Sequence, residues 1–269
     1  MTIKSIARIR IEFVTMAAFV LMIVINILAN YLPINGVTTG QVSEYYPNLF
    51  QPSTTTFAIW GLIYMLLAGY VFYQLGIFKR KINAAEDDFL SKIRVAFIYS
   101  SLANTLWIFS WHYFLLPLSM LLIIVIFLCL FYICHTVSKY DFSLEKMVFI
   151  RIPFSIYFGW ITVATIANFA VLAASLEGNY FGFGETTLTI VLLLFGQIVG
   201  MLVTLRYRDI AYGLVFIWAY AGILIKHVSE IGFSGQYHQI IIATSSCIFL
   251  TALVLAYVFF TTKRFAKND

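Results

Sequence analysis

The sequence predicts an all-α integral membrane protein with about eight transmembrane helices. Hydrophobic residues make up 62% of the chain and charged residues only 11%, whereas an average soluble domain carries about a quarter charged residues. The apolar residues form long runs, and a run of about 20 such residues is long enough to cross the hydrocarbon core of a bilayer as a helix. Membrane spans rather than soluble domains therefore account for most of the 269 residues.

Short polar or basic links separate the apolar runs. The links around Trp111–Tyr113 and Arg206–Arg208 are so short that the helices on either side of each link should be antiparallel neighbours. The first run follows three basic residues, as in a signal peptide, but it is too long and ends without a small-residue cleavage site, so we expect a retained span. The predicted spans are 11–32, 54–78, 93–111, 114–137, 147–174, 186–205, 209–226 and 239–262.

The basic residues support this arrangement of spans. Of the 17 lysine and arginine residues, all but Lys226 fall before the first span or after an even-numbered one, and Arg94 is counted among those after the second. Because positive charge marks the cytoplasmic side, we expect a cell-membrane protein with both termini in the cytoplasm. Short basic clusters between apolar runs are a topology signal, so no nucleic-acid partner is expected.

The polar residues that are missing from the spans exclude several functions. No Asp or Glu lies near the middle of a predicted span, since Glu12 and Glu185 are terminal, and this disfavours proton relays and carriers of charged solutes. No arrangement of side chains suggests a catalytic nucleophile, so we expect no enzyme and no catalytic residue. His227, Glu230 and His238 have irregular spacing, and we expect no metal site there.

The stretch from Asn48 to Tyr73 begins as a proline-containing loop and continues as an apolar helix. Phe57, Trp60 and Tyr64 have the spacing i, i+3 and i+7, which places them on one helical face suited to a flat apolar ligand. The preceding loop, 33–53, is longer than an ordinary connection, and its aromatic residues favour a packed lid. The predicted lid residues are Asn35, Tyr45, Tyr46, Phe50 and Pro52.

Polar and aromatic side chains gather towards the outer ends of the spans. With a rise of 1.5 Å per residue, Trp60 lies roughly 9 Å and Asn104 roughly 10 Å below the outer ends of their spans. Two explanations stay open. The polar side chains could join helices by hydrogen bonds beneath an aromatic belt, or they could line a ligand pocket.

The residues of the second span carry a resemblance to a known family. Pro52, Phe57, Trp60 and Tyr64, spaced P-x4-F-x2-W-x3-Y, resemble the second-helix signature of the TspO/MBR family, which includes tryptophan-rich sensory proteins and translocator proteins. The third and fifth spans resemble the matching helices of that family. The residues that carry this second likeness are Asn104, Trp107, Pro153, Tyr157, Trp160 and Asn168.

This resemblance implies a TspO-like five-helix bundle in residues 1–174, followed by three additional helices and a cytoplasmic tail in 175–269. It also implies a sensor or translocator that binds a tetrapyrrole such as haem or protoporphyrin, or a sterol, in an outer-leaflet pocket beneath the first loop. Family members are often dimers, so a homodimer is a further expectation that the resemblance carries. The expected binding residues are Phe57, Trp60, Tyr64, Asn104, Trp107, Tyr157, Trp160 and Asn168.

Two other functions remain open at this level. The three additional helices could complete a pathway, which would make the chain a transporter or permease component for a lipid or a small neutral solute. An enzyme that degrades a bound porphyrin is suggested by the family analogy alone.

Overall fold

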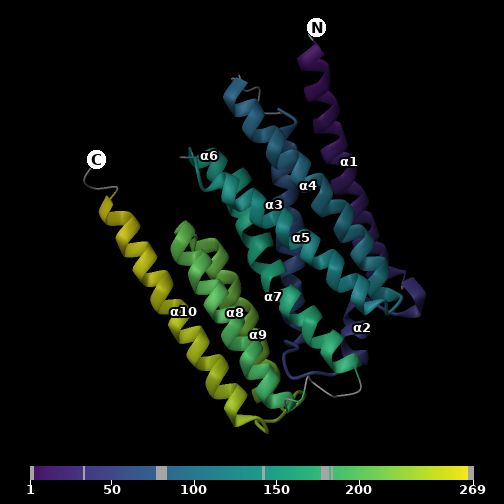
Figure 1. The fold of residues 1–269 in the computed structure, drawn as a ribbon, viewed down its shortest axis with the longest axis vertical. Helices are drawn as coiled ribbons and strands as arrows, with labels where there is room; N and C mark the ends of the chain where they lie inside the picture. The colour runs from purple at the N-terminus through teal and green to yellow at the C-terminus, as the bar shows by residue number, and fades with distance from the viewer. Residues whose placement is uncertain are drawn as a thin grey trace. The chain divides into compact units, whose positions relative to one another are not determined.

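The computed structural model describes residues 3–32, 34–76, 84–140, 143–176, 182 and 184–265, and these are mostly helical, with no strand among them (Figure 1). The all-α membrane fold predicted from the sequence is confirmed. The chain forms two compact units, which are described separately below. Unit 1 contains Met1–Val42 and Trp60–Phe154, and unit 2 contains Ser43–Ile59 and Ser155–Asp269. The domain boundary at residue 174 stays a prediction.

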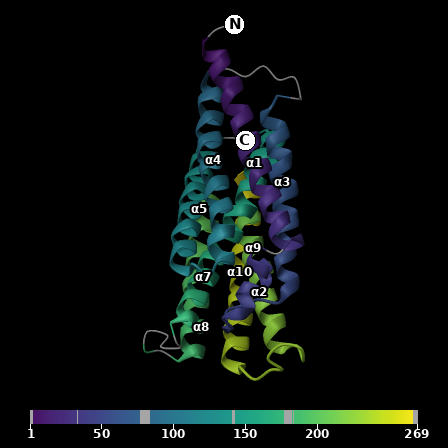
Figure 2. The ribbon, with the colours of Figure 1, turned by 90° about the vertical axis from the view of Figure 1, so that its right-hand side faces the viewer.

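In unit 1, the long helix α4 packs against both α1 and α5. Helices α1 and α4 run in one direction, whereas α3 and α5 run in the opposite one (Figures 1 and 2). The elements that lie wholly or mainly in this unit are α1 (Ile3–Tyr31), η1 (Ile34–Gly36), α3 (Ile59–Gln74), α4 (Ala84–His112), α5 (Leu116–Val137), α6 (Leu144–Lys146) and the π-helix η3 (Met147–Arg151).

A tight turn joins α4 to α5. Phe114 adopts a positive φ of 56°, and the Leu115 amide donates a hydrogen bond to the Ser110 carbonyl at 2.8 Å. Pro117 lies in the first turn of α5, where its missing N–H costs no helical hydrogen bond. The antiparallel hairpin predicted from the short link is confirmed.

Three aromatic side chains form the centre of unit 1. Tyr70, Phe97 and Phe154 are fully buried and meet pairwise at steep interplanar angles, with ring centroids 4.8 to 5.5 Å apart. Such edge-to-face pairs add to the large apolar area that each ring buries. The three rings therefore hold α3 and α4 against the first turn of α7 (Ile152–Ser175), which contains Phe154.

In unit 2, helices α8, α9 and α10 pack against one another. A side-chain carbon at Gly196 would lie 2.7 Å from the Tyr220 Oη, and one at Gly200 would lie 2.8 Å from the Phe216 ring. This Gly-x3-Gly spacing lets α8 approach α9 closely. The elements of unit 2 are η2 (Thr54–Ala58), most of α7 (Ile152–Ser175), α8 (Glu185–Tyr207), α9 (Ile210–Val228) and α10 (His238–Phe265). The short helix α2 (Thr39–Tyr45) begins in unit 1 and ends in unit 2.

Seven helical segments of the described chain are long and apolar enough to cross a membrane. They are Ile11–Tyr31, Thr54–Gln74, Leu116–Val137, Leu144–Ser175, Glu185–Tyr207, Ile210–Val228 and His238–Thr262. Helix α4, which contains the third span predicted from the sequence, is long enough with 29 residues but is not apolar enough to be counted among them. Buried polar residues such as Ser100, Ser101 and Asn104 lower its hydropathy.

The structure corrects one detail of the charge pattern. Arg94, counted as a basic residue of the link after the second span, lies inside α4 and is fully buried. The basic residues Lys79, Arg80, Lys81 and Lys267 lie outside the described residues. The side of the membrane on which the termini lie therefore stays a prediction.

Candidate functional site

The aromatic pair Trp60 and Tyr64 lies on α3 in unit 1. The two rings stack with centroids 5.4 Å apart and an interplanar angle of 26°, and both side chains are half-buried. Phe57, predicted on the same helical face, lies instead in the 3-10 helix η2, which has about 3.0 residues per turn and so breaks the α-helical period. It belongs to unit 2. Trp60 and Tyr64 therefore share a face of α3 as predicted, whereas Phe57 lies outside that helix.

Asn104 and Trp107 lie in the second half of α4, also in unit 1. The Asn26 side chain on α1 donates one hydrogen bond to the Asn104 Oδ1 at 2.7 Å and another to the Met22 carbonyl at 2.8 Å. Asn104 therefore joins two helices, which is the first of the two explanations left open above. The Trp107 ring stacks on the ring of Trp111, with centroids 5.5 Å apart.

The other predicted binding residues lie in unit 2. Phe57 meets Trp160 edge to face at 6.0 Å, and Trp160 is only 3% exposed. Tyr157 and Asn168 are buried on the same helix, α7. The eight predicted residues are thus divided between the units, with Trp60, Tyr64, Asn104 and Trp107 in unit 1 and Phe57, Tyr157, Trp160 and Asn168 in unit 2.

The first part of the long loop is bound to the end of α4 within unit 1. Asn35, one of the predicted lid residues, has a left-handed backbone with φ 54° and donates a hydrogen bond from its side chain to the His112 carbonyl at 2.9 Å. The Trp111 indole donates to the Thr39 carbonyl at 3.1 Å. Helix α2 begins with a capping box, because Thr38 and Gln41 exchange side-chain and backbone hydrogen bonds.

The second part of the loop packs within unit 2. The His227 Nε2 on α9 donates to the Leu49 carbonyl at 2.9 Å, because a carbonyl can only accept. Phe50 and Pro52 are buried, whereas Tyr45 is 68% exposed and meets Tyr46 edge to face at 5.1 Å. The loop is therefore packed at Phe50 and Pro52, and its action as a lid stays a prediction.

The segment Ser53–Thr56, which precedes Trp60 of the family signature, packs against α9. The Ser53 amide donates to the Gly222 carbonyl at 3.0 Å, and the Trp218 indole donates to the Thr56 carbonyl at 2.9 Å. A side-chain carbon at Gly222 would overlap the Thr56 side chain, so glycine is required for this approach. One of the three helices expected as additions thus positions part of the signature segment.

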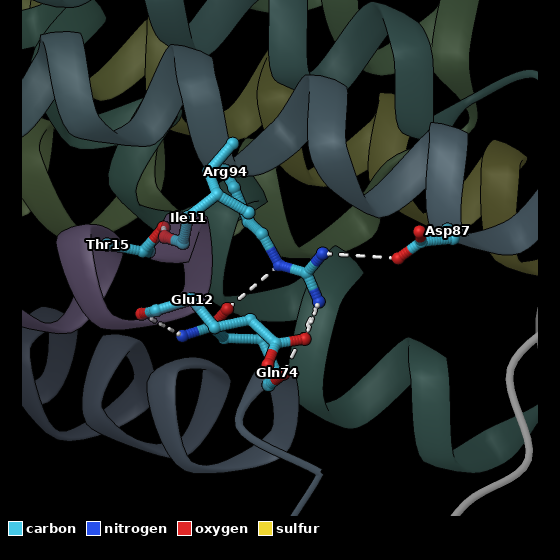
Figure 3. Close-up of polar contacts among 6 residues, drawn as sticks. All are labelled: Ile11, Glu12, Thr15, Gln74, Asp87 and Arg94. Carbon is cyan, nitrogen blue, oxygen red and sulfur yellow. Dashed lines mark hydrogen bonds and ion pairs between the residues drawn. The ribbon is translucent and has the colours of Figure 1, made fainter. Parts of the chain in front are cut away.

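A buried charged group in unit 1 was missed by the sequence reasoning (Figure 3). The Arg94 guanidinium donates to the Glu12 carboxylate at 2.9 Å and to the Gln74 Oε1 at 2.8 Å, and it lies 3.6 Å from an Asp87 carboxylate oxygen. Gln74 in turn donates to the Glu12 carbonyl at 3.1 Å. We call these four residues the Arg94 cluster. The available signal was that Arg94 falls inside the predicted third span, where charge requires a partner.

Comparison with known proteins gives the family. A family model described as TSPO-like protein matches residues 12–261, which covers most of the chain. Comparisons with curated proteins and with solved structures found no match. The matched range extends beyond the five spans that carried the resemblance and includes α8, α9 and nearly all of α10. The chain therefore belongs to the family of TSPO-like proteins.

Proposed function

We propose that this protein binds a hydrophobic planar molecule of the tetrapyrrole or sterol kind, and that it acts as a sensor or translocator for that molecule. The observation that carries the proposal is the stacked pair of Trp60 and Tyr64 on α3. The rings are half-buried and lie on a helix without charged side chains. Apolar surface with a few aromatic faces is typical of sites for flat ligands.

The chemistry of the proposed site favours stacking over metal coordination. Haem proteins hold the iron by a histidine, cysteine, methionine or tyrosine side chain. Among the eight proposed binding residues, only Tyr64 and Tyr157 belong to these types, and neither an imidazole nor a thiolate is among them. We therefore expect a metal-free porphyrin or a sterol to bind by its flat face, with Asn104 setting the distance between α1 and α4 beside Trp107.

Titration with protoporphyrin tests this proposal. The protein is held at constant concentration in detergent-free lipid nanodiscs. The porphyrin concentration is varied, and binding is followed by the absorbance of the porphyrin. Trp60→Ala and Tyr64→Ala should each weaken binding about fivefold, since an aromatic pair is worth roughly 1 kcal/mol beyond its buried area. Trp107→Ala and Trp160→Ala test the predicted residues of α4 and α7 in the same way.

Phe72→Ala is the matched control, because Phe72 is an aromatic residue of the same helix and is 55% exposed. This substitution should leave the dissociation constant unchanged. A signal that rises without saturation and is unchanged by Trp60→Ala would indicate partitioning into lipid. Saturable binding that is weakened equally by Trp60→Ala and Phe72→Ala would not be specific to the stacked pair, and either result would refute the proposed site.

We propose further that the site lies in the outer leaflet and that both termini are cytoplasmic. The distribution of basic residues along the sequence supports this orientation. Reporter fusions at the C-terminus and in the link between α4 and α5 should give opposite sides of the cell membrane. A homodimer is part of the proposal on the family resemblance alone, and crosslinking in native membranes tests it.

One observation in unit 2 favours transport of a small neutral solute as the alternative function. The Gln197 side chain on α8 accepts a hydrogen bond from Thr251 at 3.1 Å, but its buried Nε2 has no hydrogen-bond partner among the described residues. An amide at membrane depth with a free donor can bind a polar solute. Glycerol-driven swelling of vesicles should be faster with the protein and slower with Gln197→Leu, and equal rates would remove this candidate.

A further inference from the structure

One imidazole joins two points of the first loop to the end of α4 in unit 1. The His112 Nε2 lies 3.0 Å from the Thr39 Oγ1, and its Nδ1 lies 3.2 Å from the Ile34 carbonyl oxygen. The backbone of His112 also accepts the hydrogen bond from Asn35, and the neighbouring Trp111 binds the Thr39 carbonyl. We call this set of contacts the His112 latch. It fixes the segment Ile34–Val42 by four hydrogen bonds.

The partners of the ring define the position of its proton. A carbonyl oxygen only accepts hydrogen bonds, so the Nδ1 of His112 must carry the proton that reaches Ile34. The Nε2 is then unprotonated and accepts the hydroxyl proton of Thr39. Both contacts are thus made by the neutral imidazole in a single tautomer. A second proton at Nε2 would reverse the direction of the Thr39 hydrogen bond, because a hydroxyl also accepts, so protonation is disfavoured by the burial of the charge rather than by loss of a partner.

The surroundings of His112 do not compensate a positive charge. His112 is fully buried, and the segment that packs on it, Ile34–Val42, contains no acidic or basic side chain. The only carboxylate of helix α2, Glu44, is exposed, and so are Tyr31, the last residue of α1, and Tyr113, which follows His112 in the chain. Burial lowers the pKa of His112, and the backbone carbonyls of Ile34 and Val37 offset this effect only in part.

We propose that the His112 latch is a pH-sensitive switch, in which the neutral imidazole holds Ile34–Val42 on the end of α4 and protonation releases this segment. This switch goes beyond the proposed ligand binding, because it rests on the contacts of His112 and on none of the proposed binding residues. Because the segment contains Asn35 of the predicted lid, acidification on that side of the membrane would loosen the lid at this end.

Hydrogen exchange of the Ile34–Val42 amides in nanodiscs tests the switch without any ligand. After correction for the intrinsic pH dependence of exchange, the wild type should exchange about fivefold or more faster at pH 5.0 than at pH 7.5, because the charged ring is stabilised where it reaches water and destabilised in its buried position. His112→Gln keeps a donor and an acceptor but does not titrate, so this variant should stay protected at both pH values. Equal protection of the wild type at both pH values would overturn the proposal.

Two further measurements keep the test decisive if one variant folds poorly. Thr39→Val removes the hydroxyl that meets Nε2, so this variant should exchange faster at pH 7.5 and respond less to acid. A spin label at Gly40→Cys, where a side chain meets no atom within 4 Å, should become more mobile at pH 5.0 in the wild type but not with His112→Gln. The same acid response in His112→Gln would assign the change to another group and overturn the proposal.

Discussion

Two regions of α4, one around Arg94 in its first half and one at its last residue, His112, show two ways of fixing a polar group in a membrane protein. Arg94 and His112 are separated by 18 residues, or about 27 Å of helix, which is close to the thickness of the hydrocarbon core. At the Arg94 end, a full charge is buried together with a carboxylate and an amide. At the His112 end, a buried imidazole is held by a hydroxyl and a carbonyl, without a counter-charge.

The difference teaches which end can respond to the surroundings. An arginine stays protonated at every physiological pH, so the Arg94 cluster is a permanent connection between α1, α3 and α4. A histidine can change its charge in the physiological pH range, and burial lowers the pKa of His112, so the proposed latch would respond to acidification. On the proposed mechanism, the contacts around Arg94 do not change with pH, whereas those of His112 do.

The largest effect is expected for Arg94→Ala. This substitution leaves the buried Glu12 carboxylate without its counter-charge, and removal of one partner of a buried pair typically costs 3–5 kcal/mol, so we expect a loss of about 4 kcal/mol. Denaturant unfolding in mild detergent measures it. The double variant Glu12→Leu with Arg94→Leu should recover most of the loss, because no charge remains buried. A loss below about 1 kcal/mol for Arg94→Ala would contradict the structural importance of the cluster.

A smaller effect is expected for Asn104→Leu, which lies between Arg94 and His112 on α4. The substitution removes the hydrogen bond with Asn26, and such bonds between membrane helices are worth about 1 kcal/mol. The same unfolding experiment measures it, with Asn26→Leu and the double variant completing a mutant cycle. If the two single losses add without coupling, the hydrogen bond does not contribute to stability.

A pH-dependent effect is expected at the His112 end. The pKa of His112 in the folded protein is lowered from its ordinary value of 6.5, so the unfolded chain binds the proton more readily. The stability that the neutral side chain contributes is fully present above pH 6.5 and is lost as the pH falls through the lowered pKa. The difference in melting temperature between the wild type and His112→Gln should therefore shift against the wild type below pH 6.5. A difference that is constant between pH 8 and pH 5 would count against this prediction.

The smallest effect is expected for Lys92→Ala, two residues from Arg94. Lys92 pairs with Asp88 at 2.6 Å, but both side chains are largely exposed, and such surface pairs contribute little. We expect no measurable change in the unfolding midpoint. This variant is the control for Arg94→Ala, because both substitutions remove one positive charge from the same part of α4. A large loss for Lys92→Ala would mean that charge at this end matters irrespective of burial.

Much of the fold could be predicted from local patterns in the sequence. The lengths of the apolar runs correctly indicated the helices, and the short links around Trp111–Tyr113 and Arg206–Arg208 correctly indicated the turns between them. The motif that begins at Pro52 indicated the family whose model matches residues 12–261. The local environment of the predicted site was harder to predict, since Asn104 turned out to bind Asn26 and Phe57 turned out to precede the α-helix.

By itself, the sequence determined which segments are helical and apolar, because length and hydrophobic period are properties of neighbouring residues. Only the tertiary structure decided the partners of the polar groups. Arg94 could be buried because Glu12, 82 residues away, comes to lie beside it. His112 became a connection to the loop because Thr39, 73 residues away, faces its ring. Such pairings depend on the packing of whole helices, and no local pattern in the chain encodes them.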